Sequence, residues 1–174
     1  MEQNNNIISK IDHIGLNVPD IETATVFLQA AFDAEIIYES YSRELPPLDA
    51  SDELVVALNL APKATLYSCR MIKIGNGVNI ELFEIHVDGQ RQPVKSSDLG
   101  LIHFTLYTDK IHEAIQKFED AGGKILSEPM PFLFPMEKGE GNFFCYGLTP
   151  WGTTIEFITY PNGMPYEQHT DLRR

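Results

Sequence analysis

An internal repeat is the feature of this sequence that most restricts its possible folds. When the chain is shifted by 90 residues, His13 aligns with His103 and Leu16 with Leu106. In both places a short apolar strand pattern is followed by a turn with an aspartate and then by an amphipathic helix pattern. Such a period indicates two copies of one supersecondary unit. We therefore expect two similar modules with the same order of elements.

Strand patterns follow the helix in each copy. They predict strands at 34–41, 64–74 and 78–86 in the first copy, and at 124–129, 142–149 and 153–160 in the second. Each module then has the order strand, helix, strand, strand, strand. The predicted fold class is α+β, with βαβββ modules at 9–90 and 99–162 and a tail at 163–174.

Two segments interrupt this regular order. Residues 42–63 have no counterpart of equal length in the second copy, so we expect an insertion there with a short helix at 51–60. Residues 129–142 are rich in proline and glycine and predict a loop. Loops of this kind often cover binding sites, which makes both segments candidate lids.

Two histidines and two glutamates occupy matching places in the repeat. His13 and His103 lie on the first strand of each copy, and a shift of 75 residues aligns Glu81 with Glu156 on the last strands. In these strands the flanking residues are apolar and suit packing under a helix. Because side chains alternate between the faces of a strand, all four ionisable residues should lie on the face away from the helices. If the two sheets curve toward each other, the four meet in one cavity.

Two imidazoles and two carboxylates form a ligand set for a divalent metal ion. Nitrogen and oxygen ligands suit Ni, Co, Zn, Mn or Fe, with positions left for water or substrate. A lone histidine or glutamate on a strand more often has a structural or solvent-exposed place. Matching residues in both copies favour one metal ion bound by His13, Glu81, His103 and Glu156. Glu84 is the nearest rival to Glu81, but both the alignment and the alternation favour Glu81.

Further side chains are expected to line the same cavity and contact a small-molecule substrate. They are Asn17, Arg70, Phe83, Thr105, Tyr107 and Tyr146. For Arg70, a salt bridge at the surface is at least as good an interpretation. The remaining histidines, His86, His112 and His169, have no partner in the repeat and are expected at the surface.

Composition excludes some classes of partner. The formal net charge of −12 argues against binding of nucleic acid or anionic lipid through the general field. No apolar run approaches the length of a membrane span, and the polar start MEQNNNIISK does not have the order of a signal peptide, so a cytoplasmic location is expected. Cys69 and Cys145 form no CxxC pair and are expected to be free buried thiols.

The repeat and its ligand set resemble the vicinal-oxygen-chelate superfamily, which includes glyoxalase I, methylmalonyl-CoA epimerase, extradiol dioxygenases, and fosfomycin-resistance and bleomycin-binding proteins. The resemblance runs from about Ile11 to Tyr160 and implies a cup-shaped mixed sheet around a metal site. The order His, Glu, His, Glu is similar to that of glyoxalase I, whereas methylmalonyl-CoA epimerase typically has Gln where this chain has Glu81. The insertion at 42–63 and the ending GLTPWGTTIEFITYP also resemble an epimerase- and glyoxalase-like branch that includes epimerases of cyclitol (valiolone-type) biosynthesis.

The resemblance implies a metal-dependent lyase or isomerase that removes a proton next to a metal-bound oxygen. By match to similar enzymes, Glu156 is the candidate base and Glu81 the opposing acid or base. Glutathione adducts, acyl-CoA esters and keto-cyclitols are all suitable substrates, and a homodimer is one of the arrangements that the family uses. The alternatives are an Fe(II) dioxygenase and a non-catalytic protein that binds a small molecule or antibiotic. The complete ligand set argues against the non-catalytic alternative.

Overall fold

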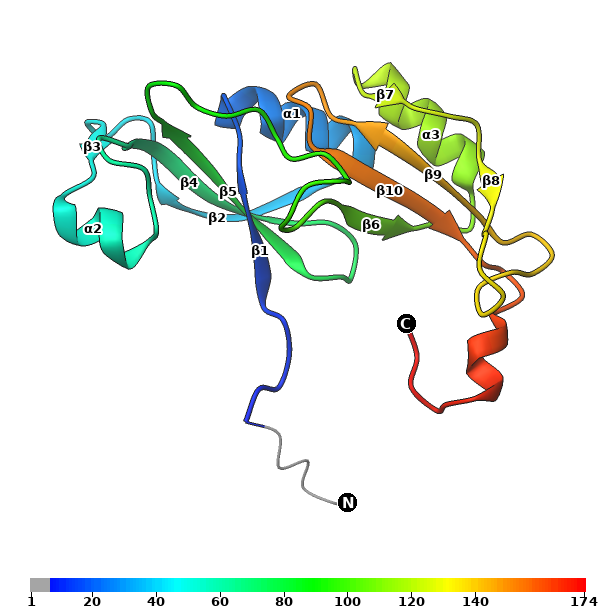
Figure 1. Ribbon diagram of the computed structural model, residues 1–174. Coiled ribbons are helices and arrows are strands. Elements are labelled where there is room, and N and C mark those ends of the chain that lie inside the picture. Colours follow the sequence, from blue (N-terminus) through cyan, green and yellow to red (C-terminus); the bar gives the residue numbers. More distant parts are fainter. Residues whose placement is uncertain (1–6) are drawn as a thin grey trace. The chain divides into compact units, whose positions relative to one another are not determined.

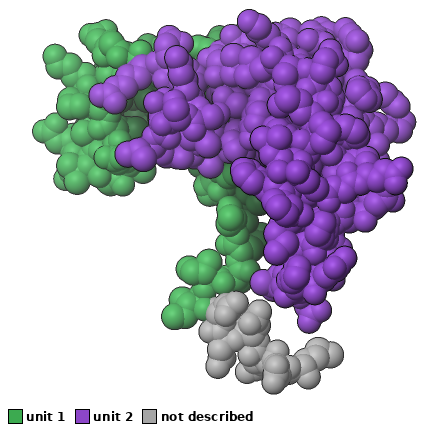
Figure 2. Space-filling view, turned by 45° about the vertical axis from the view of Figure 1, so that its right-hand side comes forward, with its two compact units in different colours: residues 1–29, 33–90 green, residues 30–32, 91–174 purple. Residues whose placement is uncertain are grey.

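The structure is a computed structural model that describes residues 7–174 (Figure 1). Residues 1–6, which belong to the polar start noted above, lie outside the described part. The chain divides into two compact units, coloured separately in Figure 2. The first comprises the chain up to Gln29 together with Asp33–Gln90, and the second comprises Ala30–Phe32 and Arg91–Arg174.

The first unit contains a mixed sheet with the strand order β1-β5-β4-β2. Strand β1 runs parallel to β5, and the other neighbours are antiparallel. The short strand β3 lies in the predicted insertion and pairs with β4. The bounds are β1 (His13–Asn17), β2 (Glu35–Tyr41), β3 (Leu48–Asp49), β4 (Thr65–Lys73) and β5 (Asn79–His86).

Helix α1 (Ile21–Phe32) follows β1 and begins at a well-formed cap. The side chain of Asp20 accepts a hydrogen bond from the backbone N–H of Thr23 at 2.7 Å, which satisfies one of the free donors of the first turn. The helix ends at Phe32, and the C-cap residue Asp33 has a left-handed backbone. The apolar face expected from the sequence is confirmed, since Ile21, Ala24, Leu28 and Ala31 are all buried.

The second unit repeats this arrangement with a sheet in the order β6-β10-β9-β7. Strand β6 is parallel to β10, and β9 is antiparallel to it. Strand β8 pairs with β9. The bounds are β6 (Phe104–Tyr107), α3 (Ile111–Asp120), β7 (Lys124–Ile125), β8 (Met130–Pro131), β9 (Phe143–Leu148), β10 (Thr154–Thr159) and a 3-10 turn η1 (Pro165–Gln168).

The core of the second unit forms where α3 meets its sheet. The ring of Phe118 is fully buried and packs edge-on against Phe157 of β10, with centroids 5.2 Å apart. Gly147 of β9 leaves the space for this ring, because a Cβ at that position would lie 2.6 Å from a ring carbon of Phe118. Phe157 therefore faces α3, and its neighbour Glu156 faces the opposite side of the sheet.

The observed elements confirm the predicted α+β class with two βαβββ units. The short helix expected at 51–60 is α2 (Asp52–Ala57), capped by the Ser51 side chain. The strand expected at 124–129 is shorter than predicted and is limited to β7. Cys69 and Cys145 are free and buried, as expected. Among the described residues, no helix is long and apolar enough to cross a membrane.

Candidate metal and active site

The first unit brings His13 and Glu81 together on one face of its sheet. Ile14 lies opposite Ile80 in the β1–β5 pairing, and both alternate with the two polar residues. Nε2 of His13 lies 3.3 Å from Oε2 of Glu81. The other ring nitrogen of His13, Nδ1, lies 3.1 Å from Oδ1 of Asp12, and this contact helps to lower the pKa of Asp12. His13 is thus oriented by a carboxylate on each side.

Glu81 has one further partner, the thiol of Cys69 on β4. The thiol donates a hydrogen bond to Oε1 of Glu81 at a sulfur–oxygen distance of 3.5 Å. Burial and the nearby Glu81 carboxylate raise the pKa of Cys69 to about 11, so the thiol keeps its proton at neutral pH. This residue was expected only as a buried thiol. Cys69 is two residues from Met71, which pairs directly with Glu81, so Cys69 and Glu81 share a face of the sheet. This shared face is the signal for the contact.

The second unit brings His103 and Glu156 together in the matching place. Nε2 of His103 lies 3.5 Å from Oε2 of Glu156, and Glu156 is only 7% exposed. Thr105 of β6 donates its hydroxyl proton to Oε2 of Glu156 at 2.7 Å. Tyr146 of β9 pairs with Glu156 across the sheet, and its pKa is raised to about 12 by burial and by the Glu156 carboxylate beside it.

The donor chemistry of each pair fits a divalent metal ion. Two ligands held about 2.0–2.2 Å from one ion lie roughly 3–3.5 Å apart in tetrahedral or octahedral geometry. The separations of 3.3 Å for His13–Glu81 and 3.5 Å for His103–Glu156 fall in this range. Each pair is a half-set, and the described residues contain no group of three or more His, Cys, Asp or Glu placed to hold a metal. In the second pair, the buried Nδ1 of His103 has no hydrogen-bond partner within residues 7–174.

Most of the side chains expected to contact substrate share the face of their sheet with one of these glutamates. Phe83 pairs with Asn17 across β1 and β5 and lies on the same face as Glu81. The Asn17 side chain is hydrogen-bonded to the backbone of β5. Its amide donates to the carbonyl of Ile85 and accepts from the N–H of the same residue. Tyr107 donates to Asp109 at 2.5 Å.

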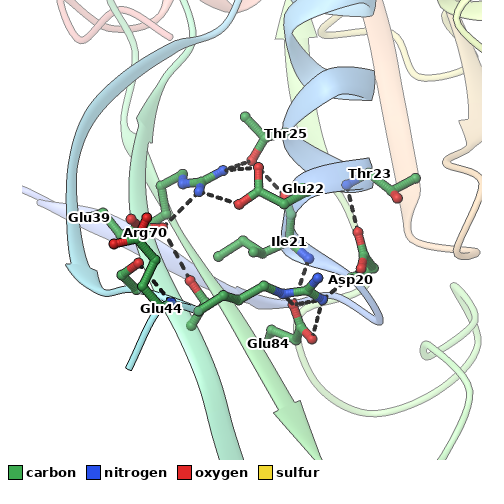
Figure 3. A network of polar contacts seen from close by, with 12 residues as sticks. Asp20, Ile21, Glu22, Thr23, Thr25, Glu39, Glu44, Arg70 and Glu84 are labelled. Carbon is green, nitrogen blue, oxygen red and sulfur yellow. Dashed lines mark hydrogen bonds and ion pairs between the residues drawn. The ribbon is translucent and has the colours of Figure 1, made fainter. Parts of the chain in front are cut away.

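Arg70 lies on the opposite face, which corrects its expected orientation. In the β4–β5 pairing it is directly opposite Leu82, so its side chain points toward α1 (Figure 3). The guanidinium bonds to Glu22 at 2.6 Å, to Glu39 at 2.7 Å and to Thr25 at 2.8 Å. Arg70 therefore forms salt bridges, as the alternative interpretation predicted. The Arg70 side chain itself is buried, whereas the side chain of its partner Glu22 is 56% exposed.

Glu84 is also placed on the helix side and anchors the start of α1. Its carboxylate accepts a hydrogen bond from the backbone N–H of Ile21 at 2.9 Å (Figure 3). It also accepts one from Nε of Arg43 at 2.9 Å. His86, expected at the surface, is half-exposed but contacts both Glu84 and the carbonyl of Pro19. Because side chains two residues apart share a face of a strand, the alternation that directs Leu82 toward the helix also predicts that Glu84 points to the helix.

Comparisons with known proteins agree with this architecture. A curated relative, 2-epi-5-epi-valiolone epimerase from an Actinomyces species, is 29% identical over 165 residues, covering 94% of this chain and 86% of the relative. A glyoxalase family protein from Bacillus cereus has a TM-score of 0.63 at 13% identity, covering 90% of this chain and 97% of that one. A mutant fosfomycin resistance protein from Listeria monocytogenes, solved with Mn(II) and a dihydroxypropylphosphonic acid, has a TM-score of 0.56 at 17% identity, covering 94% and 100%.

The match to a family profile gives the strongest evidence of family membership. The profile of the Glyoxalase/Bleomycin resistance protein/Dioxygenase superfamily matches residues 10–157, which include both His–Glu pairs. The match extends over most of the chain and covers strands from both units. The chain belongs to the Glyoxalase/Bleomycin resistance protein/Dioxygenase superfamily.

Proposed function

We propose that this protein is a metal-dependent enzyme that removes a proton from a carbon next to a chelated carbonyl or hydroxyl oxygen. The observation that carries the proposal is the repeated His–Glu pair, found in each unit on the sheet face opposite the one that packs against α1 or α3. Relatives support the enzyme class and the metal: one is named an epimerase, and another was solved with Mn(II). Within this class we favour an epimerase of a small hydroxylated ketone, because of the relative at 29% identity.

His13, Glu81, His103 and Glu156 are proposed as the protein ligands of one divalent ion. Neutral imidazole and carboxylate are ligands that Ni, Co, Zn, Mn and Fe all accept, so the residues alone leave the identity of the metal open. When bound, the ion supplies a Lewis acid that withdraws electrons from the substrate oxygen. Asp12 orients His13 for this role through the contact with Nδ1.

Glu156 and Glu81 are the candidates for proton transfer. A carboxylate that accepts the proton from the carbon next to the carbonyl leaves an electron pair that delocalises onto the oxygen. Return of a proton to the opposite face of the same carbon gives an epimer, and return to the neighbouring carbon gives an isomer. Phe83, which faces the same side as Glu81, offers an apolar wall that limits competing water.

Proton exchange with solvent tests this proposal. The protein, loaded with Mn(II), Ni(II) or Zn(II), is incubated in D₂O with a keto-cyclitol such as 2-epi-5-epi-valiolone, and in parallel with a hemithioacetal and an acyl-CoA. We expect one substrate class to gain a single deuterium, as measured by mass spectrometry, and to lose this exchange when the metal is chelated.

Variants sharpen the result of the exchange experiment. Glu156→Gln and Glu81→Gln should each reduce exchange by about a hundredfold or more, because each removes a candidate base. Glu119→Gln, on the exposed side of α3, is the matched control and should exchange at the native rate. Absence of exchange with all three substrate classes in the metal-loaded protein would count against proton abstraction.

A further inference from the structure

The two glutamates of the proposed site have different neighbours at equivalent places in the repeat. In the second unit, Glu156 lies between Thr105 of β6 and Tyr146 of β9. In the first unit, the corresponding neighbours of Glu81 are Gly15 of β1 and Met71 of β4. Both positions beside Glu156 therefore have a hydroxyl group, and both positions beside Glu81 have none.

One of these hydroxyl groups is hydrogen-bonded to the Glu156 carboxylate, and the other belongs to a ring that lies beside it. Thr105 donates to Oε2 at 2.7 Å, and Glu156 is 7% exposed, so water competes little with this bond. Tyr146 lies directly opposite Glu156 in the β9–β10 pairing, and burial together with the interaction of its hydroxyl with the carboxylate raises the pKa of Tyr146. The ring of Tyr146 packs edge-on against His103, with centroids 5.3 Å apart. A short bond from a hydroxyl to a carboxylate is among the stronger kinds of hydrogen bond, and with Tyr146 on the other side it restricts the orientation of the carboxylate.

Glu81 is held more loosely. Among the described residues, the hydrogen-bond donor found for Glu81 is the thiol of Cys69 at 3.5 Å, and a thiol is a weak donor. The side chain of Glu81 is 23% exposed, compared with 9% for Glu156. Gly15 adds no side chain beside it, and Met71 offers only a thioether. Both copies of the repeat thus contain the His–Glu pair, but only the glutamate of the second copy, Glu156, has hydroxyl-bearing side chains beside it.

We infer that Thr105 and Tyr146 are positioning residues that fix the carboxylate of Glu156 in one orientation, so that Glu156 is the rigid ligand of the pair and Glu81 the adjustable one. This inference rests on the proposed function and assigns these two side chains to the support of a ligand rather than to substrate contact. A fixed ligand defines where the ion sits, and an adjustable ligand allows the coordination to change as substrate exchanges with water.

Metal affinity of the whole protein tests this inference without measuring turnover. Isothermal titration with Mn(II) is carried out on the native protein and on Thr105→Val, Thr105→Ser and Tyr146→Phe. We expect Thr105→Val and Tyr146→Phe to weaken binding at least tenfold, the loss typical of groups that support a ligand. Thr105→Ser should stay within about threefold of the native protein, because it keeps the hydroxyl.

Two comparison variants make this result specific. Cys69→Ala removes the weak donor to Glu81 and should weaken Mn(II) binding less than Thr105→Val does. Tyr38→Phe removes a hydroxyl from the exposed strand β2 and controls for the loss of a tyrosine oxygen. Equal affinities for Thr105→Val and the native protein would overturn the inference. So would a larger loss in Cys69→Ala than in Thr105→Val.

Side-chain relaxation separates this inference from the proposed function. Order parameters from NMR on the metal-free protein should show Glu156 more rigid than Glu81, and Thr105→Val should make Glu156 more mobile. If the native protein binds no Mn(II) but Glu156 is the more rigid of the two, the proposed function fails and the positioning role stands. If Glu81 is as rigid as Glu156, the positioning role is wrong, whatever the metal affinity.

Discussion

At the scale of single residues, Asp20 shows how one side chain serves two purposes. It caps α1 by accepting from the N–H of Thr23, and it also accepts a hydrogen bond from Arg43 at 2.6 Å. The bonds to Thr23, followed by the guanidinium of Arg43, lower the pKa of Asp20 to about 2. A carboxylate whose pKa is lower in the folded state than in the unfolded chain stabilises the fold above the unfolded pKa.

The stability contribution of Asp20 should therefore depend on pH. It is complete above about pH 4, the ordinary range of an aspartate, and is lost as the pH falls toward about 2. Asp20→Asn keeps a capping side chain but not the charge, so at neutral pH it should cost about 0.5–1 kcal/mol, a modest value because the pair with Arg43 is half-exposed. Urea unfolding of both proteins between pH 7 and pH 2 checks this. A difference that stays constant over that range would contradict it.

Single residues also show where sequence reasoning succeeds and where it fails. Strict alternation in β1 and β5 made it possible to predict that His13 and Glu81 share a face, and the register agrees. Strand β4 has buried residues at five consecutive positions, Ser68–Ile72, and a register irregularity between Leu66 and Ser68. Alternation therefore carries no signal in β4. This is why the side of the sheet on which Arg70 lies could not be read from the sequence.

At the scale of elements, the start of α1 is fastened to β5 by one buried carboxylate. Glu84 is 2% exposed, and it bonds the N–H of Ile21 and the guanidinium of Arg43. A charge is costly to bury unless its partners are complete, and here they come from the helix and from the segment after β2. Glu84 therefore joins three elements that are distant in sequence. Arg70 makes a second such link to Glu22 and Thr25 of the same helix.

Removal of the Glu84 carboxylate should destabilise the first unit. Glu84→Ala leaves the buried N–H of Ile21 without a partner and is expected to lower the free energy of unfolding by about 3 kcal/mol. Glu84→Gln keeps an acceptor for that N–H and should cost less. Glu44→Ala, a nearby exposed carboxylate, is the control and should change stability by less than about 0.5 kcal/mol. Chemical unfolding at pH 7 measures all three, and equal losses for Glu84→Ala and Glu44→Ala would refute the anchoring role.

Element prediction was most accurate where periodicity was strong. Both long helices and the long strands follow clear periods of 3.6 or 2 residues, and the structure has them near the predicted bounds. The short strands β3 and β8 and the turn η1 were not predicted, because two to four residues contain too little of any period. Their formation depends on neighbours: β3 and β8 exist only through pairing with β4 and β9.

At the scale of the whole molecule, the repeat explains both the fold and the site. Each unit has the same order of strands and the same His–Glu pair on the same face. The repeat could be found in the sequence because its apolar positions and its four site residues are unchanged between the copies. The differences around the glutamates could not, because Gly15, Met71, Thr105 and Tyr146 gain meaning only once the strand register shows which residues lie beside which carboxylate.

The measurement that tests the central claim most directly is the metal content of the purified protein. Elemental analysis after loading with Ni, Co, Zn, Mn or Fe is compared for the native protein, His13→Ala and His103→Ala, with His112→Ala on the exposed side of α3 as the control. If one ion uses ligands from both pairs, the native protein and the control hold about one ion per chain, and both site variants lose it. No bound ion in the native protein, or retention of the ion in either site variant, would contradict a four-ligand centre.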